Sequence, residues 1–187
     1  MIRTDEIIIA GFGGQGVLSL GQMLAYAALM EGKETSWMPS YGPEMRGGTA
    51  NCIVIISDKK ISSPIISKFD SAIILNQPSL EKFEKAVKPG GFIFYEESTV
   101  LEPPTRKDIE SFKVNAIEEA NQMEKKQVAN MIMLGAFLEV KQLLKSESIL
   151  KALAKVLPER HHHLIPLNEA ALSKGREIIN KLHHSLV

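Results

Sequence analysis

Six residues, Gly-Phe-Gly-Gly-Gln-Gly at positions 11–16, constrain the fold more than any other stretch of this sequence. They follow the apolar, β-branched run of residues 6–10 and precede residues 17–31, in which apolar side chains recur every three or four positions. These patterns predict a buried strand and an amphipathic helix, and Gly32 is a suitable helix terminator. The chain is therefore expected to begin with a strand, a glycine turn and a helix.

The glycine turn has the spacing Gly-x-Gly-x-x-Gly in the strand-to-helix context that gives this pattern its meaning. Residues without a Cβ permit positive φ and close approach of a ligand, and the first N–H groups of the helix favour an anion. The candidate residues for binding a phosphate-bearing ligand are Gly11, Gly13, Gly14, Gln15 and Gly16. The alternative is that the glycines only allow the strand to pack closely against the helix.

A nicotinamide dinucleotide would require an Asp or Glu at the end of the second strand, about 20 residues on, to bind a ribose hydroxyl. The sequence predicts that strand over residues 35–38, so Glu34 precedes it and the next acid is Glu44. A nicotinamide-dependent dehydrogenase is therefore disfavoured.

The first two thirds of the chain alternate short strand-like and longer helix-like patterns, whereas the last third is mainly helical. Further strands are expected over residues 49–57, 71–76, 92–95 and 112–116, with a short antiparallel strand through Ile61, a helix over 78–87, and turns at 39–48 and 88–91. Later helices are expected over residues 126–144, 148–157 and 166–182. Residues 1–187 are predicted to form one α/β domain: a three-layer α/β/α, Rossmann-like, mostly parallel sheet over about 1–116 and a helical portion over about 117–187.

Composition argues against several functional classes. Lys and Arg number 22 and Asp and Glu number 22, so no basic surface for nucleic acid is expected. No apolar stretch reaches the roughly 20 residues needed to cross a bilayer, and the first residues lack the features of a signal peptide. We therefore expect a cytoplasmic protein without membrane insertion.

The sequence offers few residues for thiol chemistry or metal binding. Its single cysteine, Cys52, lies in an apolar run and is expected to be buried and inert, and one thiolate cannot hold an iron–sulfur cluster. Adjacent histidines at 161–163 and at 183–184 point in different directions and need a third fixed partner to bind a metal tightly. No metal site is predicted.

A second loop, Tyr-Gly-Pro-Glu-Met-Arg-Gly-Gly at positions 41–48, combines a rigid turn with a phenol, a carboxylate and a guanidinium. Taken alone, such groups are often surface salt bridges. Together with the glycine turn, however, the stretch from Tyr41 to Ala50 resembles the gamma subunit of 2-oxoacid:ferredoxin oxidoreductases. The resemblance extends to residues 76–79, 130–136 and 167–172, and so covers nearly the whole chain.

The resemblance implies an oxidoreductase complex that carries out CoA-dependent oxidative decarboxylation of a 2-oxoacid and reduces ferredoxin or a similar acceptor. Alpha, beta and ferredoxin-like delta subunits would supply thiamine diphosphate, Mg and 4Fe–4S clusters, with none of these cofactors held by this chain alone. The isolated chain is then expected to be colourless and inactive, with no catalytic residue of its own. The residues expected to face the partner and complete its site are Tyr41, Glu44, Arg46 and Gly47.

The substrate remains open at this level. The form of residues 41–52 is similar to that of gamma subunits of 2-oxoglutarate enzymes, which implies conversion of 2-oxoglutarate to succinyl-CoA. A gamma subunit for pyruvate or a branched-chain 2-oxoacid is the alternative. From another class, a stand-alone nucleotide-binding regulatory module would use the glycine loop alone.

Overall fold

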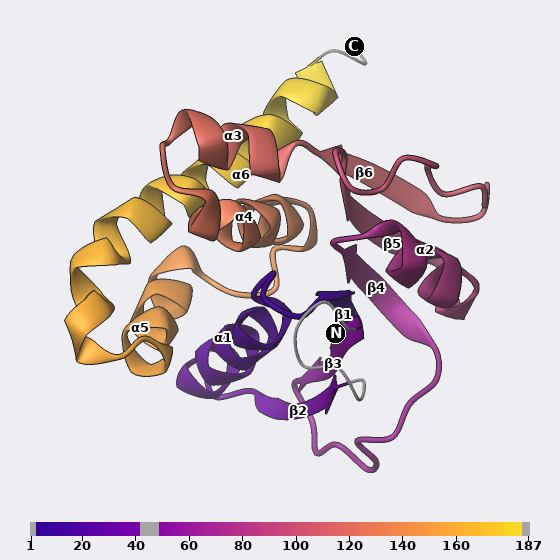
Figure 1. The fold of residues 1–187 in the computed structure, drawn as a ribbon. Helices are drawn as coiled ribbons and strands as arrows, with labels where there is room; N and C mark the ends of the chain where they lie inside the picture. The colour runs from indigo at the N-terminus through magenta and orange to yellow at the C-terminus, as the bar shows by residue number, and fades with distance from the viewer. Residues whose placement is uncertain (1–2, 42–48, 185–187) are drawn as a thin grey trace.

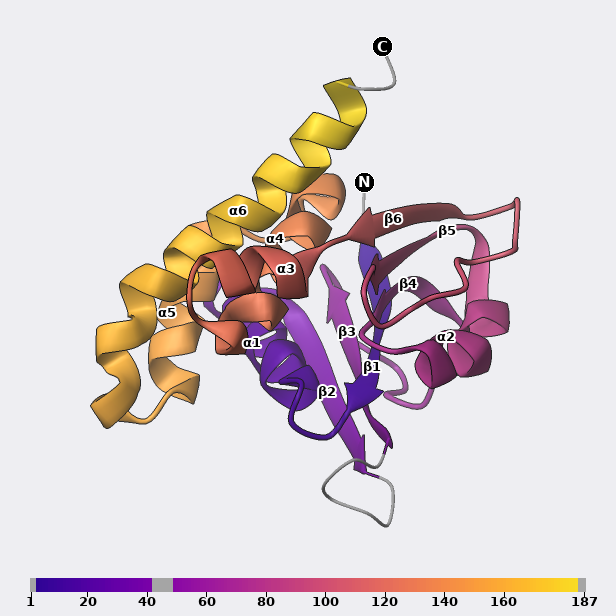
Figure 2. The same cartoon turned by 45° about the horizontal axis from the view of Figure 1, so that its top comes forward.

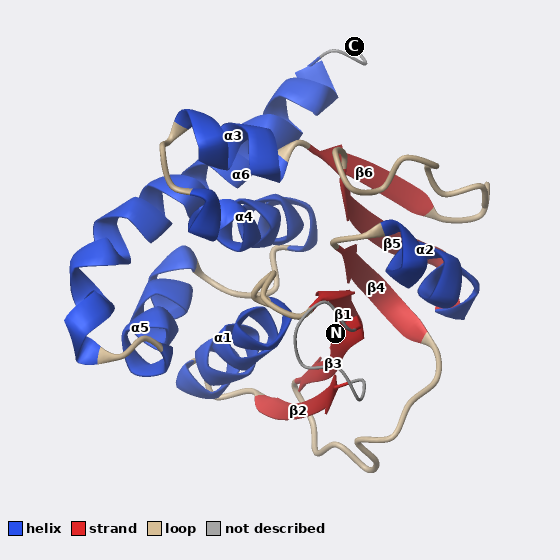
Figure 3. Ribbon diagram, viewed as in Figure 1, coloured by secondary structure: helices blue, strands red, loops and turns tan. Residues whose placement is uncertain are grey.

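The computed structural model describes residues 3–41 and 49–184, and these residues form one mixed sheet with helices on both faces (Figures 1 and 3). The six strands are β1 Thr4–Phe12, β2 Glu34–Tyr41, β3 Thr49–Ser57, β4 Phe69–Ile74, β5 Val87–Glu96 and β6 Glu110–Val114. Their order across the sheet is β2-β3-β1-β4-β5-β6. The strands β1, β4, β5 and β6 run parallel, whereas β3 runs antiparallel to both β1 and β2. The expected mostly parallel α/β sheet is confirmed.

Side chains alternate between two buried faces along the central strands. In β1, Ile7 and Ile9 enter one apolar cluster, whereas Ile8 and Ala10 enter the other. Both faces must be covered, which explains why a central strand reads as a continuous apolar run. The two clusters differ in size: the larger contains residues of five helices, whereas the smaller contains Leu80 of one short helix, α2 Gln77–Phe83 (Figure 1).

The helices are α1 Val17–Met30, α2 Gln77–Phe83, α3 Ala116–Gln122, α4 Ala129–Lys141, α5 Ser146–Val156 and α6 Ile165–His184. Helix α4 lies against the sheet and the long helix α6 crosses its outer side (Figure 2). A Cβ at Gly135 of α4 would collide with the carbonyl oxygen of Leu172 in α6, so this crossing requires glycine. The helical last third is therefore part of the domain core.

Several expected boundaries were wrong. Strand β2 begins at Glu34 and continues through Tyr41, beyond the predicted end at Met38, because residues 34–41 pair with β3 along their whole length. Residues 88–91 are not a separate turn but the first part of β5, where the pairing with β4 shifts register and Gly90 adopts φ 74°. Residues 58–68 contain no strand, so the expected strand through Ile61 is absent.

The ends of other elements shifted by a few residues. Strand β6 ends at Val114 rather than at residue 116, and helix α2 gives way to a 3-10 turn over Glu84–Ala86. Helix α3 was not predicted. None of the helices in the described part of the chain is long and apolar enough to cross a bilayer.

Candidate functional site

The glycine loop joins the carboxyl end of β1 to the first turn of α1. Gly14 has φ 96° and Gly16 has φ 78°, which favour glycine because L residues rarely adopt this region. Gly16 is also the residue before the helix, and the Asn130 side chain of α4 occupies the space where its Cβ would lie. The loop is thus held in shape by both its own backbone and α4.

The first turn of α1 is suited to an anion. No side chain caps this end, and the turn contains no acidic residue. The first amide N–H groups of a helix have no partner within it and carry the positive end of the helix dipole. A hollow of about 280 Å³ lies over this turn, lined by residues 12–14 and 16–19 and by Ala50 of β3.

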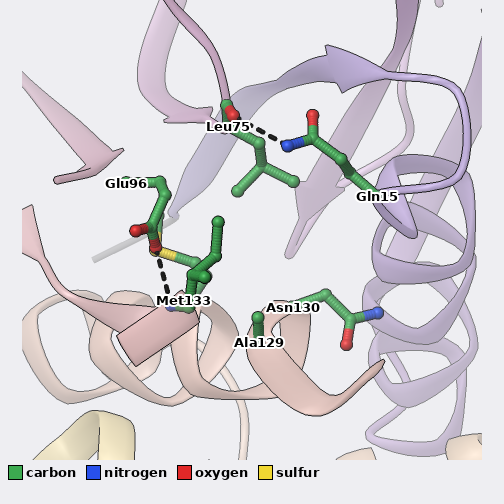
Figure 4. Close-up of a pocket in the computed structure, with 7 residues that line it drawn as sticks. Gln15, Leu75, Glu96, Ala129, Asn130 and Met133 are labelled. Atoms are coloured by element: carbon green, nitrogen blue, oxygen red, sulfur yellow. Dashed lines mark hydrogen bonds between the residues drawn. The ribbon is translucent and has the colours of Figure 1, made fainter. Parts of the chain in front are cut away.

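The side chain of Gln15 points away from this hollow, into the sheet. Its Oε1 accepts a hydrogen bond from the Phe12 N–H (2.6 Å). Its Nε2 donates to the carbonyl oxygen of Leu75 (3.0 Å) (Figure 4). Gln15 therefore ties the loop to the end of β4.

The second loop begins and ends at the same edge of the sheet as the glycine loop. Gly11 and Tyr41 both stand opposite Ala50, the first through the β1–β3 pairing and the second through the β2–β3 pairing. The other predicted residues of this loop, Glu44, Arg46 and Gly47, lie outside the described residues. The backbone thus brings the ends of the two predicted loops together at the carboxyl edge of β1.

A second, smaller cavity of about 70 Å³ lies on the inner side of the glycine loop (Figure 4). Gln15, Asn130 and Glu96 contribute its polar groups. Glu96, the last residue of β5, is 2% exposed, and burial raises the pKa of its carboxyl group above the ordinary value. Its oxygens accept hydrogen bonds from the Ser98 N–H (3.1 Å), the Ser98 hydroxyl (2.8 Å) and the Ile117 N–H (3.2 Å).

Cys52 and the histidines at 161–163 line neither cavity. Cys52 is fully buried beneath α1, as expected, and burial raises the pKa of its thiol to about 12. The histidines at 161–163 lie in a 3-10 turn that precedes α6. No group of three or more His, Cys, Asp or Glu side chains that could hold a metal ion occurs in the described ranges 3–41 and 49–184.

Sequence reasoning missed Glu96 and gave Asn130 no role in the site. Glu96 is followed by Glu97 and Ser98, a pattern typical of a strand that ends at the surface. Its burial depends on α3 and α4, which lie far along the chain. Asn130 belonged to a stretch identified only by resemblance, and its place against Gly16 required the tertiary structure.

Comparison with known proteins identifies a family. Residues 6–178 match the family model described as pyruvate ferredoxin/flavodoxin oxidoreductase. Ketoisovalerate oxidoreductase subunit VorA of Methanothermobacter thermautotrophicus is 39% identical over 172 residues, which cover 92% of this chain but 36% of VorA. The chain thus spans about a third of that relative.

Two other similar proteins match over nearly their whole length. 2-Oxoglutarate synthase subunit KorC of Methanocaldococcus jannaschii is 34% identical over 180 residues, which cover 95% of each chain. The crystal structure of the gamma subunit of a keto/oxoacid ferredoxin oxidoreductase from Geobacter sulfurreducens PCA superposes with a TM-score of 0.79 at 30% identity. That superposition covers 95% of this chain and 99% of the other.

Proposed function

We propose that this chain, which belongs to the pyruvate ferredoxin/flavodoxin oxidoreductase family, is the gamma subunit of a cytoplasmic 2-oxoacid:acceptor oxidoreductase complex. The end-to-end match to KorC and to the Geobacter gamma subunit is the observation that carries this proposal. The complex oxidatively decarboxylates a 2-oxoacid with CoA, producing acyl-CoA, carbon dioxide and electrons for ferredoxin. Alpha, beta and delta subunits hold thiamine diphosphate, Mg and the 4Fe–4S clusters, in keeping with the single buried cysteine of this chain.

The proposed 2-oxoacid is 2-oxoglutarate. It is supported by the form of residues 41–52 and by the match to KorC, whose length this chain shares. The second candidate is ketoisovalerate, a branched-chain 2-oxoacid, because identity to VorA is higher at 39%, although over part of that protein's length.

Purification of the native complex tests both statements. We expect mass spectrometry to identify alpha, beta and delta companions, and kcat/KM to be highest for 2-oxoglutarate among 2-oxoglutarate, pyruvate and ketoisovalerate. The chain alone should be colourless and inactive. Faster turnover of ketoisovalerate would show that the substrate is ketoisovalerate and would leave the role as a gamma subunit intact. A chain that purifies alone and binds a nucleotide would instead favour a regulatory module.

We further propose that the glycine loop binds a phosphate group of CoA in the outer hollow. The support comes from the free N–H groups, the absence of an acid in the first turn, and the open space beside Gly14. CoA supplies the thiol that accepts the acyl group, and this chain's residues only bind and orient its phosphate end. Ser19, which is exposed at the edge of the hollow, offers a test of this site.

Ser19→Asp places a negative charge where the phosphate would lie. A negative charge in the first turn interacts favourably with the helix dipole, so the free energy of unfolding should stay the same or increase. Repulsion of about 1–4 kcal/mol at 4 Å nevertheless predicts an apparent KM for CoA raised by about fivefold or more. Gln22→Glu, one turn further along α1, is the matched control. Equal KM values for CoA in the two variants would show that the phosphate does not bind at this turn.

A further inference from the structure

We infer that Gln15 is a positioning residue, which holds the glycine loop from inside the sheet and leaves only the outer side of the loop for the ligand. The inference rests on the proposed function, because the ligand is the phosphate group of CoA. It changes the role expected for Gln15 from the sequence, where this residue was counted among those that bind the ligand directly.

The connections of the sheet diverge between β1 and β4. β1 leads to α1 on one face and β4 leads to α2 on the other, and the two strands are parallel neighbours with Ala10 opposite Ile74 (Figure 1). In open α/β sheets, ligands bind at such a point, in the crevice outside the carboxyl ends of the strands. A diphosphate in the usual position would therefore lie between the ends of β1 and β4.

In this chain the side chain of Gln15 occupies that position. Its two hydrogen bonds connect the Phe12 N–H on β1 to the carbonyl oxygen of Leu75 just after β4, so both ends of the amide are engaged within the protein. A Cβ on Gly11 would lie 2.6 Å from Oε1 of Gln15, which shows how closely the side chain lies against the end of β1.

Little space remains behind Gln15. The inner cavity has a volume of about 70 Å³, against about 280 Å³ for the outer hollow. Buried Glu96 lies on its wall, and the ionised form of its carboxyl group would repel a phosphate. The outer hollow of about 280 Å³ has neither restriction. Gln15 thus fixes the backbone that binds the phosphate without touching the phosphate.

Two substitutions separate positioning from direct contact. Gln15→Met keeps the side-chain volume and removes both hydrogen bonds, whereas Gln15→Glu keeps the acceptor for Phe12 and places a carboxylate against the carbonyl oxygen of Leu75. In the assembled complex, we expect both variants to raise the apparent KM for CoA by about tenfold. We expect kcat and the KM for the 2-oxoacid to stay within about twofold of the wild type. Gln22→Met is the matched control on the same helix.

Amide hydrogen exchange of the isolated chain gives a readout independent of activity. We expect exchange over residues 11–16 to accelerate in Gln15→Met and to remain unchanged in Gln22→Met. A KM for CoA at least ten times higher in Gln15→Glu than in Gln15→Met would show that the side chain faces the phosphate, and would overturn the inference. Unchanged exchange, or faster exchange with an unchanged KM, would also overturn it. A wild-type complex without CoA-dependent activity would instead refute the proposed function.

Discussion

The two edges of the sheet stabilise their buried carboxylates in different ways. At the amino edge, Asp5 is 3% exposed and its Oδ1 lies 3.1 Å from Nζ of Lys141, at the end of α4. At the carboxyl edge, Glu96 is equally buried, but its hydrogen bonds come from amide and hydroxyl groups, and no cation pairs with it among the described residues. The buried carboxylate at the amino edge is paired with a cation, and the one at the carboxyl edge relies on dipoles, although Glu97 beside it pairs with Lys113 (2.6 Å).

The amino edge thus contributes mainly to stability, and the carboxyl edge to ligand binding. Lys88 reinforces the amino edge, because its Nζ lies 2.6 Å from Glu6 and 2.8 Å from Asp70 on neighbouring strands. Paired charges attach the ends of strands and helices but leave no unbalanced charge for a ligand. The carboxyl edge keeps helix N–H groups and a hollow available. Stability and ligand binding should therefore respond to substitutions at different edges.

The largest expected effect is the loss of stability in Lys141→Met. Removal of one partner of a buried ion pair leaves a buried charge and costs about 3–5 kcal/mol. We expect about 3 kcal/mol, the lower end of this range, because Nε of the half-exposed Arg3 remains 3.6 Å from Asp5. Urea unfolding of the isolated chain measures the change.

The double variant Asp5→Asn, Lys141→Met is the control for this prediction. It removes both charges, so much of the lost stability should return. The apparent KM for CoA of the complex should stay unchanged in both variants. A higher KM in Lys141→Met would show that the two edges are coupled.

The elements that the sequence predicted well are those whose pattern is local. Strand β1 and helix α1 follow directly from an apolar run, a glycine turn and a helical repeat, and the position of the glycine loop follows from them. The predicted end of β2 and the predicted start of β5 were wrong, because Pro39 and the sequence Pro-Gly-Gly at 89–91 are typical of turns. In the structure, pairing with a neighbouring strand outweighs these local preferences.

The candidate site was predictable only in outline. The five loop residues were proposed from their spacing, and the register places Tyr41, where the second loop begins, at the same edge. The direction of the Gln15 side chain was not predictable, because it depends on the carbonyl oxygen of Leu75, 60 residues away in the chain. The polarity of the inner cavity likewise depends on contacts between β5 and α4.

A second prediction concerns the carboxyl edge. Arg46→Ala removes a guanidinium that we expect to bind a carboxylate or phosphate, while Glu44 orients it. A lost charge-assisted contact of about 1.5–3 kcal/mol corresponds to roughly ten- to over a hundredfold weaker binding of CoA or of the partner subunit. Measurement of the KM for CoA and of complex yield tests this, with exposed Arg160→Ala as the control. If both quantities equal those of the wild type, the second loop has a structural role only.

The smallest expected effect is the pH dependence of stability in Glu96→Gln. Burial raises the pKa of the Glu96 carboxyl group, so the folded state retains this proton to higher pH than the unfolded chain does. Wild-type stability should therefore fall relative to Glu96→Gln as the pH rises through the folded pKa, by at most about 1.4 kcal/mol per pH unit. Urea unfolding of both proteins between about pH 4 and pH 8 gives the difference. A cation paired with Glu96 would reverse the sign, because the wild type would then gain stability with rising pH. That result would remove the contrast with Asp5, since both buried carboxylates would then be paired with a cation.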